Sequence, residues 1–186
     1  MSSRDQEVEK YVAAYRNREY RMGPTRRVDV ERVLRSLPKG SLLDVGTGRG
    51  ETLTIATAIG HAPVKGTEVV PYLLRPPVIE YAQAHALPFG DGEFDHVTCF
   101  DVLEHLLDED LVPALREFQR VARGTVTVSA AVKSHVYQGV ELHPSARSFE
   151  AWHELIVMTW GGGFRNGNAG KYSGLWQLIK EPTRAD

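Results

Sequence analysis

Apolar residues near the start of the chain recur every three or four positions, and this spacing predicts two helices. The first covers residues 4–20 and the second covers about 25–36. Between them lies the segment Met22-Gly23-Pro24-Thr25, where glycine and proline interrupt the helical pattern. The apolar positions are Val8, Tyr11, Val12, Tyr15, Val28, Val30, Val33, Leu34 and Leu37. We interpret residues 1–37 as a helical lid outside the main fold.

From residue 41 onward, short apolar runs alternate with segments of helical spacing. The runs predict strands at 41–45, 64–69, 78–82, 95–100, 125–129 and 175–180. The segments between them predict helices at 51–60, 108–121 and 148–160. Such an alternation is typical of an α/β fold with a doubly wound, mostly parallel sheet and helices on both faces.

The remaining organisation is simple. No repeat and no internal linker interrupts the chain, so we expect one domain over residues 1–186, with the sheet core at 41–181. The Gly- and Asn-rich segment 161–170 predicts a loop. This loop is either a plain hairpin connection or a segment that gates the site.

The composition excludes several classes of protein. Lys and Arg total 22 against 24 Asp and Glu, a net charge of −2, whereas a dedicated nucleic-acid binder carries a basic excess. The single cysteine, Cys99, excludes an internal disulfide and fits a reducing compartment. The sequence contains no run of about 20 apolar residues and no signal-like amino end. We therefore expect a cytoplasmic protein without nucleic-acid or membrane partners.

Charge is nevertheless unevenly distributed. Residues 1–40 hold ten basic and six acidic side chains, and residues 91–110 hold eight acidic and no basic ones. Both segments can be solvated surfaces, or the basic segment can face an anionic ligand. The side chains that would do so are Tyr11, Tyr15, Arg16, Arg18, Tyr20 and Arg21.

The most informative segment is Leu42-Leu43-Asp44-Val45-Gly46-Thr47-Gly48-Arg49-Gly50. A buried strand leads into a glycine-rich turn and then a helix, which lets a ligand approach the main chain closely. The spacing is G-x-G-x-G rather than the G-x-G-x-x-G of dinucleotide enzymes. Asp44 would repel a pyrophosphate but suits a cationic ligand. Glu68 follows 22 residues after Gly46, at the end of the next strand, where a carboxylate accepts hydrogen bonds from ribose hydroxyls.

Four segments in this order resemble class I S-adenosylmethionine-dependent methyltransferases of the small-molecule and glycan group. They are Asp44 to Gly50, Val64 to Glu68, Ala84 to Asp95, and Phe100-Asp101-Val102-Leu103-Glu104-His105-Leu106. The resemblance is specific over residues 41–130 and extends to the rest only in outline. It implies a Rossmann-like sheet of seven strands, with S-adenosyl-L-methionine as cofactor and S-adenosyl-L-homocysteine as product.

The resemblance also implies roles for individual residues. Asp44 and the turn Gly46, Thr47, Gly48 and Gly50 would hold the methionyl portion of the cofactor. Glu68 would bind the ribose hydroxyls, and Val69 would pack on the adenine. Gln83 and Ala84 would meet the adenine edge, although the family often has Asp near position 83; an amide oxygen can still accept that hydrogen bond. Phe100 and Asp101 would lie near the methionine amino group.

A hydroxyl acceptor must lose a proton during methyl transfer, and His is the usual base at neutral pH. His143 and His105 are the candidates: His143 follows the fifth strand on the carboxyl side of the sheet, and His105 belongs to the fourth matching segment. Both can instead be structural, and His135 is a weaker third candidate. Asp101, Asp108, Glu109 and Asp110 could suggest a metal, but helix capping explains the last three, so we expect none.

The sequence therefore predicts methyl transfer to a hydroxyl oxygen of a small-molecule or sugar-containing acceptor. Two other functions stay open. The first is an S-adenosylmethionine-binding enzyme that does not methylate, such as a lyase or an aminopropyl transferase. The second is a catalytically silent binding or regulatory module that keeps the pocket.

Overall fold

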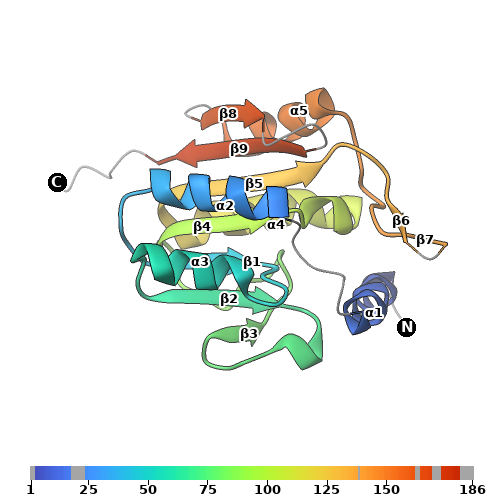
Figure 1. The fold of residues 1–186 in the computed structure, drawn as a ribbon. Helices are drawn as coiled ribbons and strands as arrows, with labels where there is room; N and C mark the ends of the chain where they lie inside the picture. Colours follow the sequence, from blue (N-terminus) through green and yellow to red (C-terminus); the bar gives the residue numbers. More distant parts are fainter. Residues whose placement is uncertain (1–2, 18–23, 138, 162–163, 169–172, 181–186) are drawn as a thin grey trace.

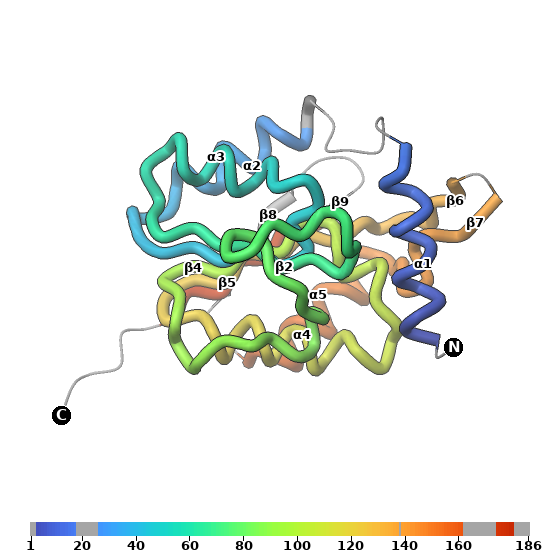
Figure 2. Tube along the Cα trace, turned by 90° about the horizontal axis from the view of Figure 1, so that it is seen from below, coloured from blue at the N-terminus to red at the C-terminus, as the bar shows by residue number. Residues whose placement is uncertain are grey.

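A mixed seven-stranded sheet divides the molecule into two helical layers, as shown by a computed structural model that describes residues 3–17, 24–137, 139–161, 164–168 and 173–180. One face carries α2 (Pro24–Ser36) and α3 (Glu51–Ile59), and the other carries α4 (Asp108–Val121) and α5 (Phe149–Trp160) (Figures 1 and 2). The first helix, α1 (Ser3–Arg16), lies apart from both layers, at one end of the sheet.

The strand order is β3-β2-β1-β4-β5-β9-β8. The first five of these strands run parallel, and β9 pairs antiparallel with both β5 and β8. The order reverses between β1 and β4, so ligands are expected beyond the carboxyl ends of these two strands. The strands are β1 (Leu42–Val45), β2 (Val64–Glu68), β3 (Ile79–Tyr81), β4 (Phe94–Phe100), β5 (Ala122–Ala131), β8 (Phe164–Asn168) and β9 (Ser173–Ile179).

Apolar burial holds the layers together on both faces. The larger core lies against α4 and α5, where Phe118, Trp152 and Trp176 are fully buried. The smaller core includes Leu34 of α2 and Leu42 of β1, also fully buried. Because each such side chain contributes about 1.5–3 kcal/mol when removed from water, the sheet is a rigid platform for the loops at its carboxyl edge.

Three short elements complete the chain. The 3-10 turns η1 (Pro71–Leu73) and η2 (Leu103–His105) follow β2 and β4. A two-stranded hairpin, β6 (Val136–Tyr137) and β7 (Val140–Glu141), extends from the carboxyl end of β5 toward α1 (Figure 1). Among the described residues, no helix combines the length and the apolar character that crossing a membrane requires.

The α/β class and the doubly wound, mostly parallel sheet predicted from the sequence are confirmed. The prediction of a loop over 161–170 is wrong for 164–168, which form the edge strand β8. There the antiparallel pairing with β9 outweighs the low strand preference of glycine and asparagine. The hairpin β6–β7 was not predicted. Of the first helix, 18–20 lie outside the described residues, and the described part ends at Arg16.

Candidate functional site

The turn after β1 requires glycine for two separate reasons. Gly46, Gly48 and Gly50 have φ angles of 69°, 55° and 80°, which side chains rarely tolerate. At Gly46 space is also lacking, because a Cβ atom would lie 2.5 Å from Cγ2 of Val102. The bare backbone of Gly46 thereby becomes part of a cavity wall.

Glu68, at the end of β2, is fixed by three backbone amides. Its Oε2 accepts from Gly48 N at 2.7 Å, and its Oε1 accepts from Val69 N at 2.8 Å and Val70 N at 3.1 Å. Burial raises the pKa of this carboxyl above its usual value, and the three amides oppose that shift. The carboxylate therefore braces the glycine turn and also reaches the cavity.

Asp44 is buried in β1 beneath the turn and is not among the residues that line the cavity. Its Oδ1 accepts from Oγ1 of Thr98 at 2.7 Å. Burial raises the pKa of Asp44 to about 6, although the hydrogen bond from Thr98 opposes that shift. A carboxylate kept at such a cost is typical of a functional site rather than of a core.

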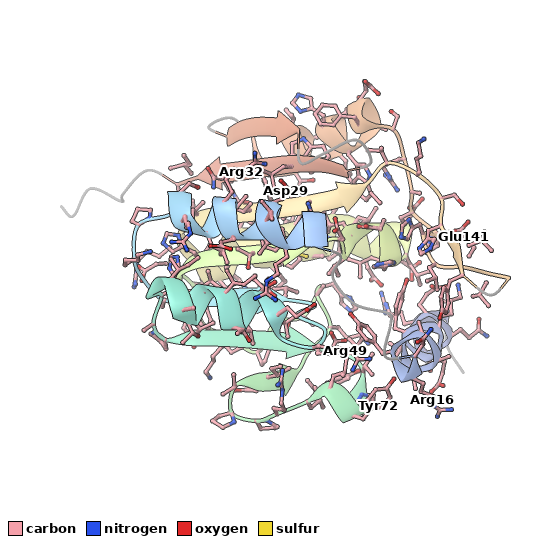
Figure 3. All side chains as sticks on the ribbon, in the orientation of Figure 1. Arg16, Asp29, Arg32, Arg49, Tyr72 and Glu141 are labelled. Atoms are coloured by element: carbon pink, nitrogen blue, oxygen red, sulfur yellow. The ribbon has the colours of Figure 1, made fainter. Side chains whose placement is uncertain are left out.

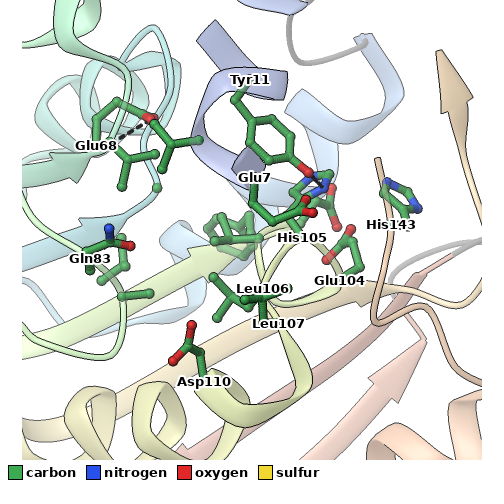
Figure 4. Close-up of a pocket in the computed structure, with 18 of the residues that line it drawn as sticks. Glu7, Tyr11, Glu68, Gln83, Glu104, His105, Leu106, Leu107, Asp110 and His143 are labelled. Carbon is green, nitrogen blue, oxygen red and sulfur yellow. Dashed lines mark hydrogen bonds between the residues drawn. The ribbon is translucent and has the colours of Figure 1, made fainter. Parts of the chain in front are cut away.

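A cavity of about 430 Å³ lies at the carboxyl ends of the strands, between the sheet and α1, and its size suits a small ligand (Figure 4). Most of the candidate residues line it: Gly46, Glu68, Val69, Gln83, Ala84, Phe100, Asp101, His105 and His143. Four candidates do not line the cavity: Asp44, Thr47, Gly48 and Gly50. Glu68 and Gln83 lie at one end of the cavity, and the two histidines lie at the other.

Asp101 occupies an unusual position just after β4. Its φ is 55°, the one positive value at a non-glycine residue in the described chain. Its amide donates to the Ser129 carbonyl at 3.1 Å, and its Oδ1 accepts from Nη2 of Arg26 at 2.6 Å and from Oγ of Ser129 at 2.9 Å. This network holds a strained turn against the cavity, and strain of this kind clusters at functional sites.

Both histidines at this end of the cavity are hydrogen-bonded to backbone carbonyl groups. Nδ1 of His105 lies 2.8 Å from the Leu142 carbonyl, and Nδ1 of His143 lies 2.7 Å from the Lys133 carbonyl. Burial lowers the pKa of His105 to about 3 and also lowers that of His143, so both rings are neutral near pH 7. His135 packs on His143 with 5.3 Å between ring centroids but does not line the cavity.

Beside them, Glu104 of η2 is 1% exposed. Burial raises its pKa to about 8, and the nearby Asp101 carboxylate adds to that shift. Its Oε2 has no hydrogen-bond partner among the described residues. The sequence analysis gave Glu104 no role, although it stands directly before the candidate His105.

Helix α1 closes the cavity from outside. Arg4 donates to both carboxylate oxygens of Asp110 in α4, at 2.6 and 2.9 Å. On the opposite side, Arg49 donates to the Tyr15 carbonyl at 2.7 Å and Tyr72 donates to the Val12 carbonyl at 2.5 Å (Figure 3). Five side chains of α1 line the cavity: Arg4, Glu7, Val8, Tyr11 and Tyr15.

Sequence reasoning missed several of these residues. The contact between Arg26 and Asp101 spans 75 positions of the sequence, and the contact between Arg4 and Asp110 spans 106. No local pattern indicates contacts of this length. Arg18, Tyr20 and Arg21, which were candidates for an anionic ligand, lie outside the described residues. The histidines given no role do not line the cavity; for example, His61 bonds the Leu34 carbonyl and His96 the Pro38 carbonyl.

Comparison with protein families gives one match: a model described as a methyltransferase domain matches residues 43–129. That range runs from β1 to β5 and contains most of the residues that line the cavity. A search of the curated proteins finds no match to this chain.

Three solved structures with similar folds share 14 to 20% identity with the chain, so they bear on the fold alone. One is Burkholderia thailandensis 1,6-didemethyltoxoflavin-N1-methyltransferase with bound 1,6-didemethyltoxoflavin and S-adenosylhomocysteine (15% identity, 94% of this chain and 87% of that chain, TM-score 0.70). Another is a SAM-dependent methyltransferase from Aquifex aeolicus (20%, 94% and 97%, TM-score 0.61). A third is a complex between the Haloferax volcanii Trm112 methyltransferase activator and a methyltransferase (14%, 100% and 100%, TM-score 0.63).

Proposed function

We propose that this class I S-adenosylmethionine-dependent methyltransferase, whose residues 43–129 match the family model, methylates a hydroxyl oxygen of a small-molecule or sugar-containing acceptor. One observation carries the proposal: a single cavity joins Glu68 and Gln83 at one end to His105 and His143 at the other. A cofactor bound at the first end would present its reactive group toward the second.

The residues at the first end fit the cofactor chemically. The fixed Glu68 carboxylate offers acceptors for ribose hydroxyls, and Val69 and Ala84 offer apolar contact for a base. Asp44 supplies negative charge beneath the turn, which suits the cationic methionyl portion. When bound, S-adenosylmethionine supplies a sulfonium methyl group, whose carbon bonds to the acceptor oxygen as the sulfur–carbon bond breaks and its electron pair stays on sulfur.

His143 is the better candidate for the base. A base works best when its pKa lies near the working pH, and the pKa of His105, about 3, is too low for that. His143 is only part-buried, and its Nδ1 faces the Lys133 carbonyl, so the lone pair is on Nε2. Nε2 of His143 would accept the hydroxyl proton as the acceptor oxygen attacks.

Helix α1 acts as the lid in this proposal, whereas α2, which the sequence analysis included in the lid at 1–37, packs on the sheet instead. Because α1 lines the cavity with five side chains, it can exclude water and hold the acceptor in line with the cofactor. We further propose that residues 1–186 work as a single domain with a diffusible acceptor. A regulatory protein partner is a separate prospect, suggested by the likeness to the Haloferax complex.

A nitrogen acceptor is the second candidate, and the Glu7 carboxylate favours it. Glu7 lies beside His105 in the cavity, where its negative charge attracts an amine. The Burkholderia enzyme is named for methylation at a nitrogen. An acceptor screen distinguishes the two candidates.

The first experiment is calorimetric titration of the protein with S-adenosylmethionine and S-adenosylhomocysteine, repeated on Asp44→Ala. The matched control is Asp91→Ala, because the side chain of Asp91 is 83% exposed and lies outside the cavity. We expect saturable binding by the wild type and the control, and loss of binding in Asp44→Ala. No binding by the wild type would favour a silent module.

The second experiment measures S-adenosylhomocysteine release with matched alcohol, polyol, glycoside and amine acceptors. Turnover of hydroxyl compounds that falls in His143→Gln supports the proposal. Turnover of amines alone would replace it with the second candidate. Loss of cofactor without S-adenosylhomocysteine formation would indicate a non-methylating enzyme.

A further inference from the structure

Three potential metal ligands meet at the histidine end of the cavity. Glu104 and His105 come from η2, and His143 comes from the segment after β7. One ligating atom from each side chain lies within 4.8 Å of the other two. Neighbouring ligands on one side of an ion stand about 3.0–3.4 Å apart at metal–ligand distances near 2.1 Å, so the group has to close by up to about 1.8 Å around an ion.

The His143 imidazole is held in the form that binds a metal. A carbonyl oxygen only accepts hydrogen bonds, so Nδ1 of His143, which faces the Lys133 carbonyl, carries the proton and leaves the lone pair on Nε2. The ring of His105 is oriented by the Leu142 carbonyl and the Tyr11 hydroxyl at Nδ1, and it also bonds to the Asp101 backbone. Histidine ligands typically donate their other ring N–H to a backbone carbonyl in this way, which fixes the tautomer and the orientation of the ring.

The carboxylate is a second and independent observation. Glu104 is 1% exposed and lines the cavity, yet its Oε2 has no partner within the described part of the chain. A buried carboxyl oxygen without a partner is unfavourable, because it has given up its hydration without a replacement contact. A metal ion that reached this oxygen would supply the missing contact.

Two hydrogen bonds from Ser145 hold the contributing segments together, and a third orders the segment that carries His143. Ser145 N donates to the Glu104 carbonyl at 3.2 Å, and Oγ of Ser145 donates to the Leu106 carbonyl at 2.6 Å. His143 N donates to Oε1 of Glu141 at 2.7 Å. The segment carrying His143 is thereby fixed against η2, which is the preorganisation that a metal site needs.

We propose that Glu104, His105 and His143 bind one divalent transition-metal ion of the Mn²⁺ or Zn²⁺ class. Two imidazoles and one carboxylate on one side of an ion leave positions open for an exogenous ligand. Those positions face the cavity, so the ion would coordinate an oxygen of the acceptor. This last step rests on the proposed function, and it narrows the acceptor to hydroxyl compounds that chelate a metal.

The ion changes how the acceptor is activated. With Nε2 of His143 used as a ligand, the acceptor hydroxyl is activated by the metal, which lowers the pKa of a bound hydroxyl as it does that of bound water. The proton then passes to solvent water, and His143 acts as a positioning group for the ion rather than as the base.

The test is a titration of untagged, chelator-treated protein with Mn²⁺, followed by the loss of the free-ion signal in electron paramagnetic resonance. The same titration is run on Glu104→Gln, His143→Gln and the control His153→Gln, whose residue lies on α5 outside the cavity. Circular dichroism and S-adenosylhomocysteine binding are measured on each sample. Both show whether a variant is folded.

We expect the wild type and His153→Gln to bind one Mn²⁺, and folded Glu104→Gln and His143→Gln to bind it at least tenfold more weakly. Absence of binding by the wild type, or unchanged binding by Glu104→Gln, overturns the metal site. If either site variant does not fold, a wild-type Mn²⁺ spectrum without histidine nitrogen couplings overturns it equally. Failure of S-adenosylhomocysteine binding with Mn²⁺ binding intact would reject the proposed function and leave the metal site standing.

Discussion

The hydroxyl of Tyr11 lies 2.6 Å from Nδ1 of His105, although 94 positions separate the two residues in the sequence. Their rings meet edge to face, with 4.7 Å between centroids. The same hydroxyl donates to the Leu142 carbonyl at 2.6 Å. The middle of α1 is thus joined to the histidine end of the cavity at one buried point.

Tyr11→Phe keeps the ring and removes only the hydroxyl. We expect it to lower the free energy of unfolding by about 1 kcal/mol, the usual net value of one hydrogen bond. The larger effect should be local: the amides of α1 should exchange their hydrogens several-fold faster, because α1 detaches more often while the core stays folded. Hydrogen exchange followed by mass spectrometry of residues 3–16 measures this.

Tyr72→Phe is the matched control for this change. Its hydroxyl also bonds α1, at the Val12 carbonyl, but Tyr72 is 49% exposed and water can replace the lost bond. Exchange in α1 should change little in this variant. Equal acceleration in both variants would contradict the assignment of Tyr11 as the main attachment of the lid.

Glu68→Gln tests the carboxylate that braces the glycine turn. Glutamine can accept at one terminal atom only, so its NH2 group would face the amide of Gly48 or those of Val69 and Val70. We expect a loss of about 1–3 kcal/mol in the free energy of unfolding from the unpaired donors. S-adenosylhomocysteine should bind at least tenfold more weakly by calorimetry.

The control for this variant is Glu80→Gln on the neighbouring strand β3. Glu80 pairs with Lys65 at 3.1 Å and both side chains are about one-third exposed, so its loss should cost less than about 1 kcal/mol. Wild-type affinity for S-adenosylhomocysteine in Glu68→Gln would remove Glu68 from the proposed cofactor contacts.

The elements with strong local signals were predictable. The strand, glycine turn and helix around Asp44 follow from a buried apolar run, the permissive backbone of glycine and regular apolar spacing. That pattern also located the sheet edge where the cavity lies. The position of Glu68 at the end of the second strand followed from its distance to the turn, because βαβ units have a narrow range of lengths, whereas its contact with ribose hydroxyls stays a prediction.

The rest depends on contacts that sequence order hides. Asp101 is held by two partners, Arg26 and Ser129, which come from two other elements. The hairpin β6–β7 has strands of two residues, too short for any periodic signal. Segment 164–168 forms a strand only because β9 is beside it, so tertiary pairing outweighs its local preference.

Asp95→Asn tests a stabilising contact away from the cavity. Asp95 Oδ2 accepts from N and Oγ of Ser41, both at 2.8 Å, and Oδ1 accepts from Arg123 at 2.6 Å. The Arg123 guanidinium is the main reason that the pKa of Asp95 falls to about 2. The side chain is 35% exposed, so solvent screening limits its contribution to about 1 kcal/mol.

The sign of the pH effect follows from that lowered pKa. A carboxyl whose pKa is lower in the folded state stabilises the fold above its unfolded pKa of about 3.9, and the effect is lost as pH falls toward 2. Asp95→Asn should therefore be less stable than wild type in urea unfolding at pH 7 and nearly equal to it near pH 2. A difference that grows on acidification would contradict this account.

Asp44 should show the opposite behaviour, because its pKa is raised to about 6 by burial. A carboxyl with a raised folded pKa stabilises the fold fully below about pH 3.9, and this contribution is lost as pH rises through about 6. At pH 8 the ionised Asp44 is therefore a cost to the fold. Asp44→Asn, which keeps an oxygen for Thr98, should raise the free energy of unfolding by about 1 kcal/mol at that pH.

Binding should move the other way. If the ionised carboxylate attracts the ammonium group of the bound ligand, wild-type affinity for S-adenosylhomocysteine should rise between pH 5 and 7, as Asp44 loses its proton near pH 6. Asp44→Asn should bind at least tenfold more weakly at pH 8 and lose most of this pH dependence, while Asp91→Asn follows the wild type. A variant that gains stability and loses affinity identifies a carboxylate retained for its ligand. Wild-type affinity in Asp44→Asn at pH 8 would assign Asp44 to the turn alone.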